Sequence, residues 1–117
     1  MPFRIAIIEP VVETTGNINY NEADTAEQTV LIMALPARTI IRSLWFDFAN
    51  VTQITTLRLY HQIDGANYRQ CAQYSWNPAL DSAGVMIDGF TAYRNVRVSF
   101  QCGGGGAGSV VVPYAVV

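Results

Sequence analysis

The clearest strand pattern in this chain is the stretch Arg42-Ser43-Leu44-Trp45-Phe46-Asp47-Phe48-Ala49. Its apolar residues Leu44, Phe46 and Phe48 recur at every second position, and alternate side chains of a β-strand point to the same face. One face of this stretch is therefore predicted to lie in a hydrophobic core, and the other to face outward. The same period recurs in three later stretches, which are residues 55–63, 68–76 and 93–102.

Turn-forming residues separate these runs. Asp64-Gly65 is expected to form a hairpin, Gly16-Asn17 a turn, and the glycine-rich run Gly103 to Gly108 a flexible hairpin loop. Tyr20 to Thr29 is compatible either with a helical turn capped by Asp24 or with a loop. Over 117 residues this spacing gives about eight strands, which predicts an all-β fold: one antiparallel β-sandwich domain of jelly-roll type.

The two strands that flank the Asp64-Gly65 hairpin are each predicted to alternate between two faces. Before the turn, the expected apolar face carries Leu57, Leu59, His61 and Ile63; after it, Tyr68, Ala72, Tyr74 and Trp76 are expected to share one face.

Residues 1–14 are expected to form an N-terminal arm or an edge strand. Phe3 to Val12 is mostly apolar, and Pro2 and Pro10 restrict where it can pair within a sheet. The apolar run Ile5 to Ile8 is too short for a signal peptide, so we expect synthesis in a cytoplasm without export. No run approaches 18 uninterrupted apolar residues, and no membrane partner is expected.

The charged residues exclude several chemistries. The net charge is −2 and all seven basic residues are arginines, so nucleic-acid binding, Schiff-base catalysis and a Walker-type lysine are not expected. With one histidine, His61, we predict no catalytic site, no metal site and no cofactor. Carboxylates that a hydrolase could pair, Asp47, Asp64 and Asp88, are better explained in part by Asp-Gly turns. The two cysteines, Cys71 and Cys102, are expected as small hydrophobes rather than a bridge.

Apolar and aromatic side chains are more numerous than one small core requires. Half of the residues are hydrophobic and only 14% are charged, which favours burial of the surplus against further copies of the chain. The aromatic rings on the strands have two other possible roles: they could pack in the core, or Trp45, Trp76 or Tyr74 could stack on sugar rings. The candidate interface residues are Phe3, Ile5, Ile7, Trp45, Tyr74, Trp76 and Tyr114.

Three blocks carry a family likeness: Gly16-Asn17-Ile18-Asn19-Tyr20, Leu35-Pro36-Ala37-Arg38-Thr39-Ile40 and Leu57-Arg58-Leu59-Tyr60-His61-Gln62-Ile63-Asp64-Gly65. The chain resembles small β-sandwich virion proteins of tailed bacteriophages, of the capsid-decorating or tail-associated kind. This resemblance implies a non-enzymatic homo-oligomer located in the virion, with a major capsid or tail protein as partner and Phe3 to Val12 as an arm for a neighbour's sheet. The alternative functions are a carbohydrate-binding module that takes a glycan and the subunit of an extracellular filament.

Overall fold

The computed structural model describes residues 13–35, 38–92 and 94–117, and its regular structure is all β-strand. Within these ranges no helix exists that would be long and apolar enough to cross a membrane. The strands are β1 (Thr14–Asn21), β2 (Gln28–Met33), β3 (Thr39–Asp47), β4 (Thr55–His61), β5 (Arg69–Trp76), β6 (Gly84–Ala92), β7 (Val96–Cys102) and β8 (Ser109–Val116).

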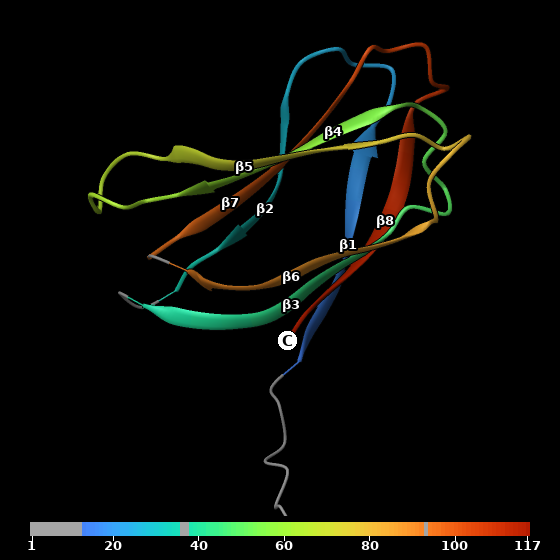
Figure 1. Ribbon diagram of the computed structural model, residues 1–117. Helices are drawn as coiled ribbons and strands as arrows, with labels where there is room; N and C mark the ends of the chain where they lie inside the picture. The colour runs from blue at the N-terminus through green and yellow to red at the C-terminus, as the bar shows by residue number, and fades with distance from the viewer. Residues whose placement is uncertain (1–12, 36–37, 93) are drawn as a thin grey trace, which may run out of the picture.

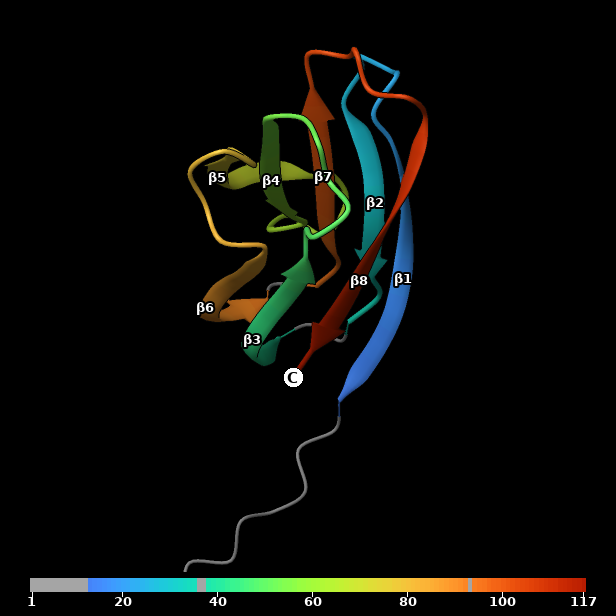
Figure 2. The same cartoon turned by 90° about the vertical axis from the view of Figure 1, so that its right-hand side faces the viewer.

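The strands pair as one long hairpin that is folded over on itself. β1 pairs with β8, β2 with β7, β3 with β6 and β4 with β5, all antiparallel. Pairing of β3 with β8 and of β4 with β7 then gives the sheets β1-β8-β3-β6 and β2-β7-β4-β5. This nested order is a jelly roll, so the predicted eight-stranded sandwich is confirmed. Figures 1 and 2 show the two sheets facing each other, with β1 and β2 on one side and β5 and β6 on the other.

Aromatic rings fill the space between the sheets. The ring of Phe100 packs edge-on against Tyr20, Phe46 and Phe48, with centroids 5.3, 5.3 and 5.2 Å apart. Each such pair stabilises a core by about 0.5–1.5 kcal/mol beyond the area that it buries. Leu44 is fully buried beside them. The alternation that opened the sequence analysis therefore identifies the core face of β3 correctly.

The first described strand, β1, was not expected, because Gly16-Asn17 was predicted to be a turn. Instead these residues lie inside β1, paired with Tyr114 and Pro113 of β8. Ile18 and Tyr20 are buried on the inner face of the strand. A side chain at position 16 would meet the ring of Tyr114, since an added Cβ would lie 2.7 Å from it. Pairing and burial thus override the local turn preference. The predicted strand or arm at Phe3 to Val12 falls outside the described residues.

The hairpin at Asp64-Gly65 forms as predicted, but a β-bulge changes which side chains face the core. The register shifts between Leu59 and Tyr60, and a one-residue shift moves the following side chains to the opposite face. Tyr68 was expected to share a face with Tyr74, and instead lies on the outer face with its ring 5.0 Å from the guanidinium of Arg97. Ile63 was expected on the apolar face of its strand, but it lies beyond the end of β4 and is 56% exposed.

Residues 22–27 form a loop, so the helical alternative for this segment is wrong. Asp24 Oδ1 accepts a hydrogen bond from the backbone N–H of Ala26 at 2.9 Å, which closes a local Asx turn rather than a helix cap.

Glu22 joins three loops at one end of the sandwich. Its buried carboxylate accepts hydrogen bonds from the backbone N–H groups of Thr52 and Gln53, at 2.9 and 2.8 Å, and from the Thr52 hydroxyl at 3.0 Å. Its backbone is paired with Gly106 and Gly108. The glycine-rich segment was predicted to be a flexible hairpin loop, but β7 and β8 belong to different sheets, so it is a crossover between the sheets, and two hydrogen bonds tie it to Glu22.

Candidate functional site

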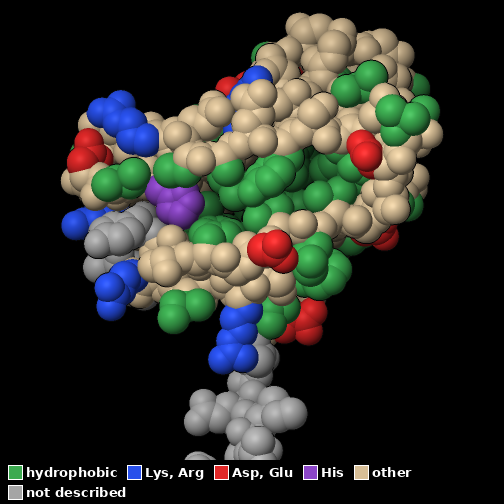
Figure 3. Space-filling model, viewed as in Figure 1, with side chains coloured by type: hydrophobic (Ala, Val, Ile, Leu, Met, Phe, Trp, Pro, Cys, Tyr) green, Lys and Arg blue, Asp and Glu red, His purple; other side chains and the backbone are tan. Residues whose placement is uncertain are grey.

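The two sheets diverge between their edge strands β5 and β6, which leaves an open groove on that side of the sandwich. Two connected hollows of about 260 and 340 Å³ lie there. Tyr74, Met86 and Ile87 line both of them, so they form one continuous feature, bounded by Trp76 at one end and His61 at the other. We call it the β5–β6 groove. Figure 3 looks into it: hydrophobic side chains line the gap between the two layers, and the histidine lies at one end.

The floor of the groove is the hydrophobic core itself. Ile87 of β6 is buried, and Trp76 of β5 is 7% exposed with its ring 5.0 Å from that of Phe48. The indole N–H of Trp76 donates to the backbone carbonyl of Ser82 at 2.8 Å, so its polar atom is satisfied. Tyr74 faces the same interior as Leu57, its partner on β4, yet is 44% exposed because no strand covers it. The groove is thus a partly uncovered portion of the core.

His61 closes the other end of the groove. It is nearly buried, and its ring lies 5.6 Å from that of Phe90. Burial lowers its pKa below the ordinary value, which keeps the imidazole neutral at physiological pH. Its place on the core face of β4 agrees with the sequence prediction.

The three carboxylates considered for catalysis each make a separate interaction. Asp47 accepts from the backbone of Ala49 at 3.0 Å. Asp64 accepts from the backbone N–H groups of Asn67 and Ala66, and these bonds hold its pKa far below the usual range. Asp88 pairs with Ser43 on the outer side of β6. In the described part of the chain, no three His, Cys, Asp or Glu side chains are grouped so as to hold a metal ion. Asp47 and Asp64 therefore serve the turns.

A polar cluster occupies the outer face of the sheet β2-β7-β4-β5. The carboxylate of Glu27 accepts hydrogen bonds from the hydroxyls of Tyr60 and Ser99 and lies 3.9 Å from Arg58 Nη1. Burial opposes ionisation of Glu27, but these two hydrogen bonds and the charge of Arg58 outweigh it, so its pKa is lowered. The guanidinium of Arg97 lies 4.2 Å above the Tyr60 ring. The cluster fastens the loop before β2 to the sheet.

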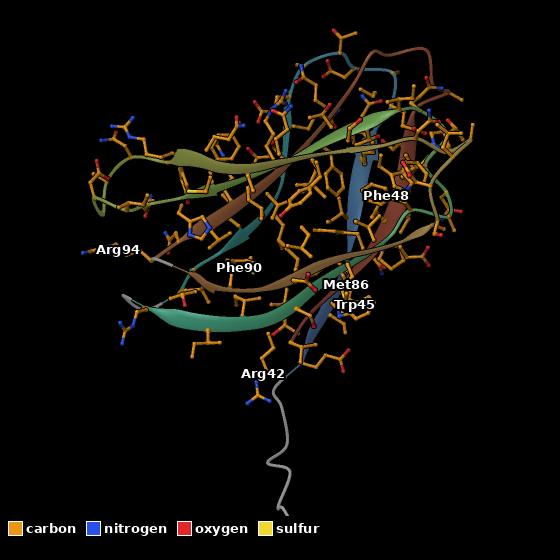
Figure 4. The ribbon with its side chains drawn as sticks, in the orientation of Figure 1. Arg42, Trp45, Phe48, Met86, Phe90 and Arg94 are labelled. Atoms are coloured by element: carbon orange, nitrogen blue, oxygen red, sulfur yellow. The ribbon has the colours of Figure 1, made fainter. Side chains whose placement is uncertain are left out.

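An apolar row crosses the outer face of the other sheet. Thr15, Ala115, Trp45 and Met86 are direct cross-strand partners, one from each of β1, β8, β3 and β6. Trp45 is 44% exposed and Met86 50%, and Figure 4 shows both beside the outer side of β3 and β6, with Phe48 between the sheets. The indole N–H of Trp45 donates to the Ser43 hydroxyl at 2.8 Å. We call this set the Trp45 row.

The predicted interface residues do not form one surface. Trp45 lies on an outer face and Tyr74 in the groove, whereas Trp76 is buried. Tyr114 packs against the core on the opposite side of the sandwich, where it lines a separate hollow of about 240 Å³ with residues of β2. Phe3, Ile5 and Ile7 lie outside the described residues. The rings of Trp45, Tyr74 and Trp76 therefore make no common platform for a sugar.

Sequence reasoning missed Met86 and the groove. Met86 lies between the inward residues Val85 and Ile87. A run of three residues is too short for alternation to assign the face on which Met86 lies. Cys71 is exposed and Cys102 is buried, and neither is bridged. Cys102 therefore behaves as the small core residue that was expected, while Cys71 does not.

Comparison of the chain with protein-family models, with curated proteins and with solved structures gives no match.

Proposed function

We propose that this chain is a non-enzymatic structural protein that assembles in many copies on a virus particle, as a capsid-decorating or tail component. Its copies associate through apolar interfaces and through strand addition at the edges of their sheets. The observation that carries this proposal is the pair of exposed apolar surfaces next to the edge strand β6, which are the β5–β6 groove and the Trp45 row.

Two features support assembly over a solitary role. Trp45, Tyr74 and Met86 are each 44–50% exposed, although large apolar side chains gain about 1.5–3 kcal/mol from full burial. Ion pairs are sparse in the described residues, where only Arg58–Glu27 and Arg69–Asp64 lie within 4.0 Å. A standard interface of roughly 1,600 Å² would cover either surface and hold copies together after the cost of ordering.

The decisive experiment measures association of the purified full chain. Light scattering after size exclusion, over a range of concentrations, is expected to show oligomers, and electron microscopy of the native particle is expected to show repeated copies. A chain that stays strictly monomeric at high concentration, and that no particle or filament retains, would refute the proposal.

A further inference from the structure

We infer that the β5–β6 groove binds residues 3–8 of a second copy, which add as an antiparallel strand to the free edge of β6. This inference rests on the proposed function, because it names the site and the segment through which copies associate. The groove has the two features that strand addition requires. It has an apolar lining that is partly uncovered at Tyr74, and among the described residues β6 is hydrogen-bonded to a strand on one side only.

The occupant is chosen by pattern and length. Residues 3–8 read Phe-Arg-Ile-Ala-Ile-Ile, with Phe3, Ile5 and Ile7 on one face of a strand. Pro2 and Pro10 flank the segment and limit pairing to the residues between them. Six extended residues span about 20 Å, enough to pair with six of the seven β6 residues that line the groove, Gly84 to Phe90.

Charge selects β6 over β5 as the strand that is extended. β6 carries Asp88, whose outer side is open to a neighbour, whereas β5 begins at the exposed Arg69. The segment carries Arg4, which is attracted by Asp88, whereas β5 has no acidic residue and its Arg69 is already paired with Asp64 at 3.9 Å. Placing Arg4 opposite Asp88 puts Ala6 opposite Met86.

The same register closes the groove on its inner side. Ile5 and Ile7 then lie opposite Ile87 and Val85, which face the other sheet as their β3 partners Leu44 and Phe46 do. Phe3 lies opposite Gly89, an exposed position without a side chain. The outer residues Ala6 and Ile8 would extend the Trp45 row by one strand.

Chain reach assigns the segment to a second copy. β1 is the far edge of the same sheet. In this register the path from residue 8 to Thr14 crosses about four strand spacings and runs back along the strand direction by three residues, which is a straight-line distance of roughly 21 Å. Six residue steps span at most about 20–22 Å when fully extended. A chain's own segment would have to pass straight through its own sheet, which the strands between forbid.

The test is a cysteine cross-link between two differently tagged full-length chains, each with Cys71→Ser. One chain carries Ala6→Cys and the other Met86→Cys, because residues directly opposite on one face of a sheet have Cβ atoms about 4.5–5.5 Å apart. Mild oxidation is expected to yield a heterodimer. The matched control replaces Met86→Cys by Asn19→Cys, on the far edge strand β1, and is expected to yield at least ten-fold less. Equal yields, or no heterodimer, would overturn the inference.

Point variants separate this inference from the proposed function. Ile5→Asp places a charge in the apolar groove and is expected to weaken association at least ten-fold, whereas Val12→Asp, outside the paired residues, leaves it within two-fold. On the groove side, Tyr74→Arg is expected to weaken association and Gln73→Arg, on the outer face of β5 and outside both hollows, to leave it unchanged. If Ile5→Asp and Tyr74→Arg associate like the unchanged chain, the inference fails while the proposed function stands. If the unchanged chain never associates, both fail.

Discussion

Glu22 is the buried acid among the described residues, and its described contacts are hydrogen bonds rather than an ion pair. Glu22→Ala would leave the backbone N–H groups of Thr52 and Gln53 without their acceptor. We expect a loss of about 2 kcal/mol in the free energy of unfolding, because bonds to a charged group are the stronger kind. Urea denaturation measures this loss. The same substitution at the exposed Glu13 is the control and should change stability by less than about 0.5 kcal/mol; equal effects at both positions would contradict this role.

His61 makes the stability of the fold depend on pH. Its pKa in the folded protein lies below the ordinary 6.5 because of burial, so the unfolded chain takes up the proton first as the pH falls. The stabilisation is complete above pH 6.5 and decreases as the pH drops towards the folded-state pKa. Urea denaturation at pH 7.5 and at lower pH should show a steeper decline for the unchanged chain than for His61→Gln. As the chain has one histidine, identical declines would exclude it as the source.

Individual side chains were predictable where a strand is covered on a known face. Leu44, Phe46 and Phe48 are buried as alternation requires. Tyr74 is on the predicted face of β5 yet remains half exposed, because exposure also depends on how far the facing sheet has diverged. No local pattern encodes that distance, so the groove could not be read from residue periodicity.

The connection between β7 and β8 offers a prediction at the scale of one element. An added Cβ at Gly106 would lie 2.4 Å from that of Glu22, whereas one at Gly103 would meet nothing within 4 Å. Gly106→Ala should therefore destabilise the protein by about 1–3 kcal/mol through overpacking. Gly103→Ala is the matched control and should be neutral or slightly stabilising. Thermal denaturation of both variants distinguishes them; a tolerant Gly106 would mean that the loop does not pack on Glu22.

Elements were predictable as types more reliably than in their bounds. The hairpin β4–β5 follows from its Asp-Gly turn, but no local signal marks the register shift beside Tyr60, which places Tyr68 on the outer face. β1 was missed because Gly16-Asn17 has turn character in isolation. Its partner is β8, at the far end of the chain, and only that pairing makes the segment a strand.

At the scale of the whole molecule, the Trp45 row is expected to take part in association. Trp45→Glu puts a charge on a surface that would be dehydrated between copies, and truncated interface aromatics commonly cost 2 kcal/mol or more. We expect the dissociation constant of the assembly to rise by at least about ten-fold. Asn19→Glu, exposed on the same outer face, is the control and should change it little. Sedimentation measures both constants, with the melting temperature as a check on folding; an unaffected Trp45→Glu would remove this row from the interface.

The two-sheet architecture could be predicted from strand count, turn spacing and composition. The nested pairing could be proposed only as a type, because strand order depends on contacts between segments that lie far apart in sequence. The groove follows from that order, since β5 and β6 become edges on the same side.

The pairing of β1 with β8 also sets the timing of folding during synthesis. About 90 residues separate the two strands, so a ribosome adding about 5–20 residues per second makes β1 roughly 5–20 s before its partner. Throughout that interval β1 has no neighbour in its own sheet, and the nascent chain exposes Ile18 and Tyr20 to other chains on the same polysome. Such distant pairing slows closure of the sheet, and it makes early encounters between nascent copies a competitor of correct folding.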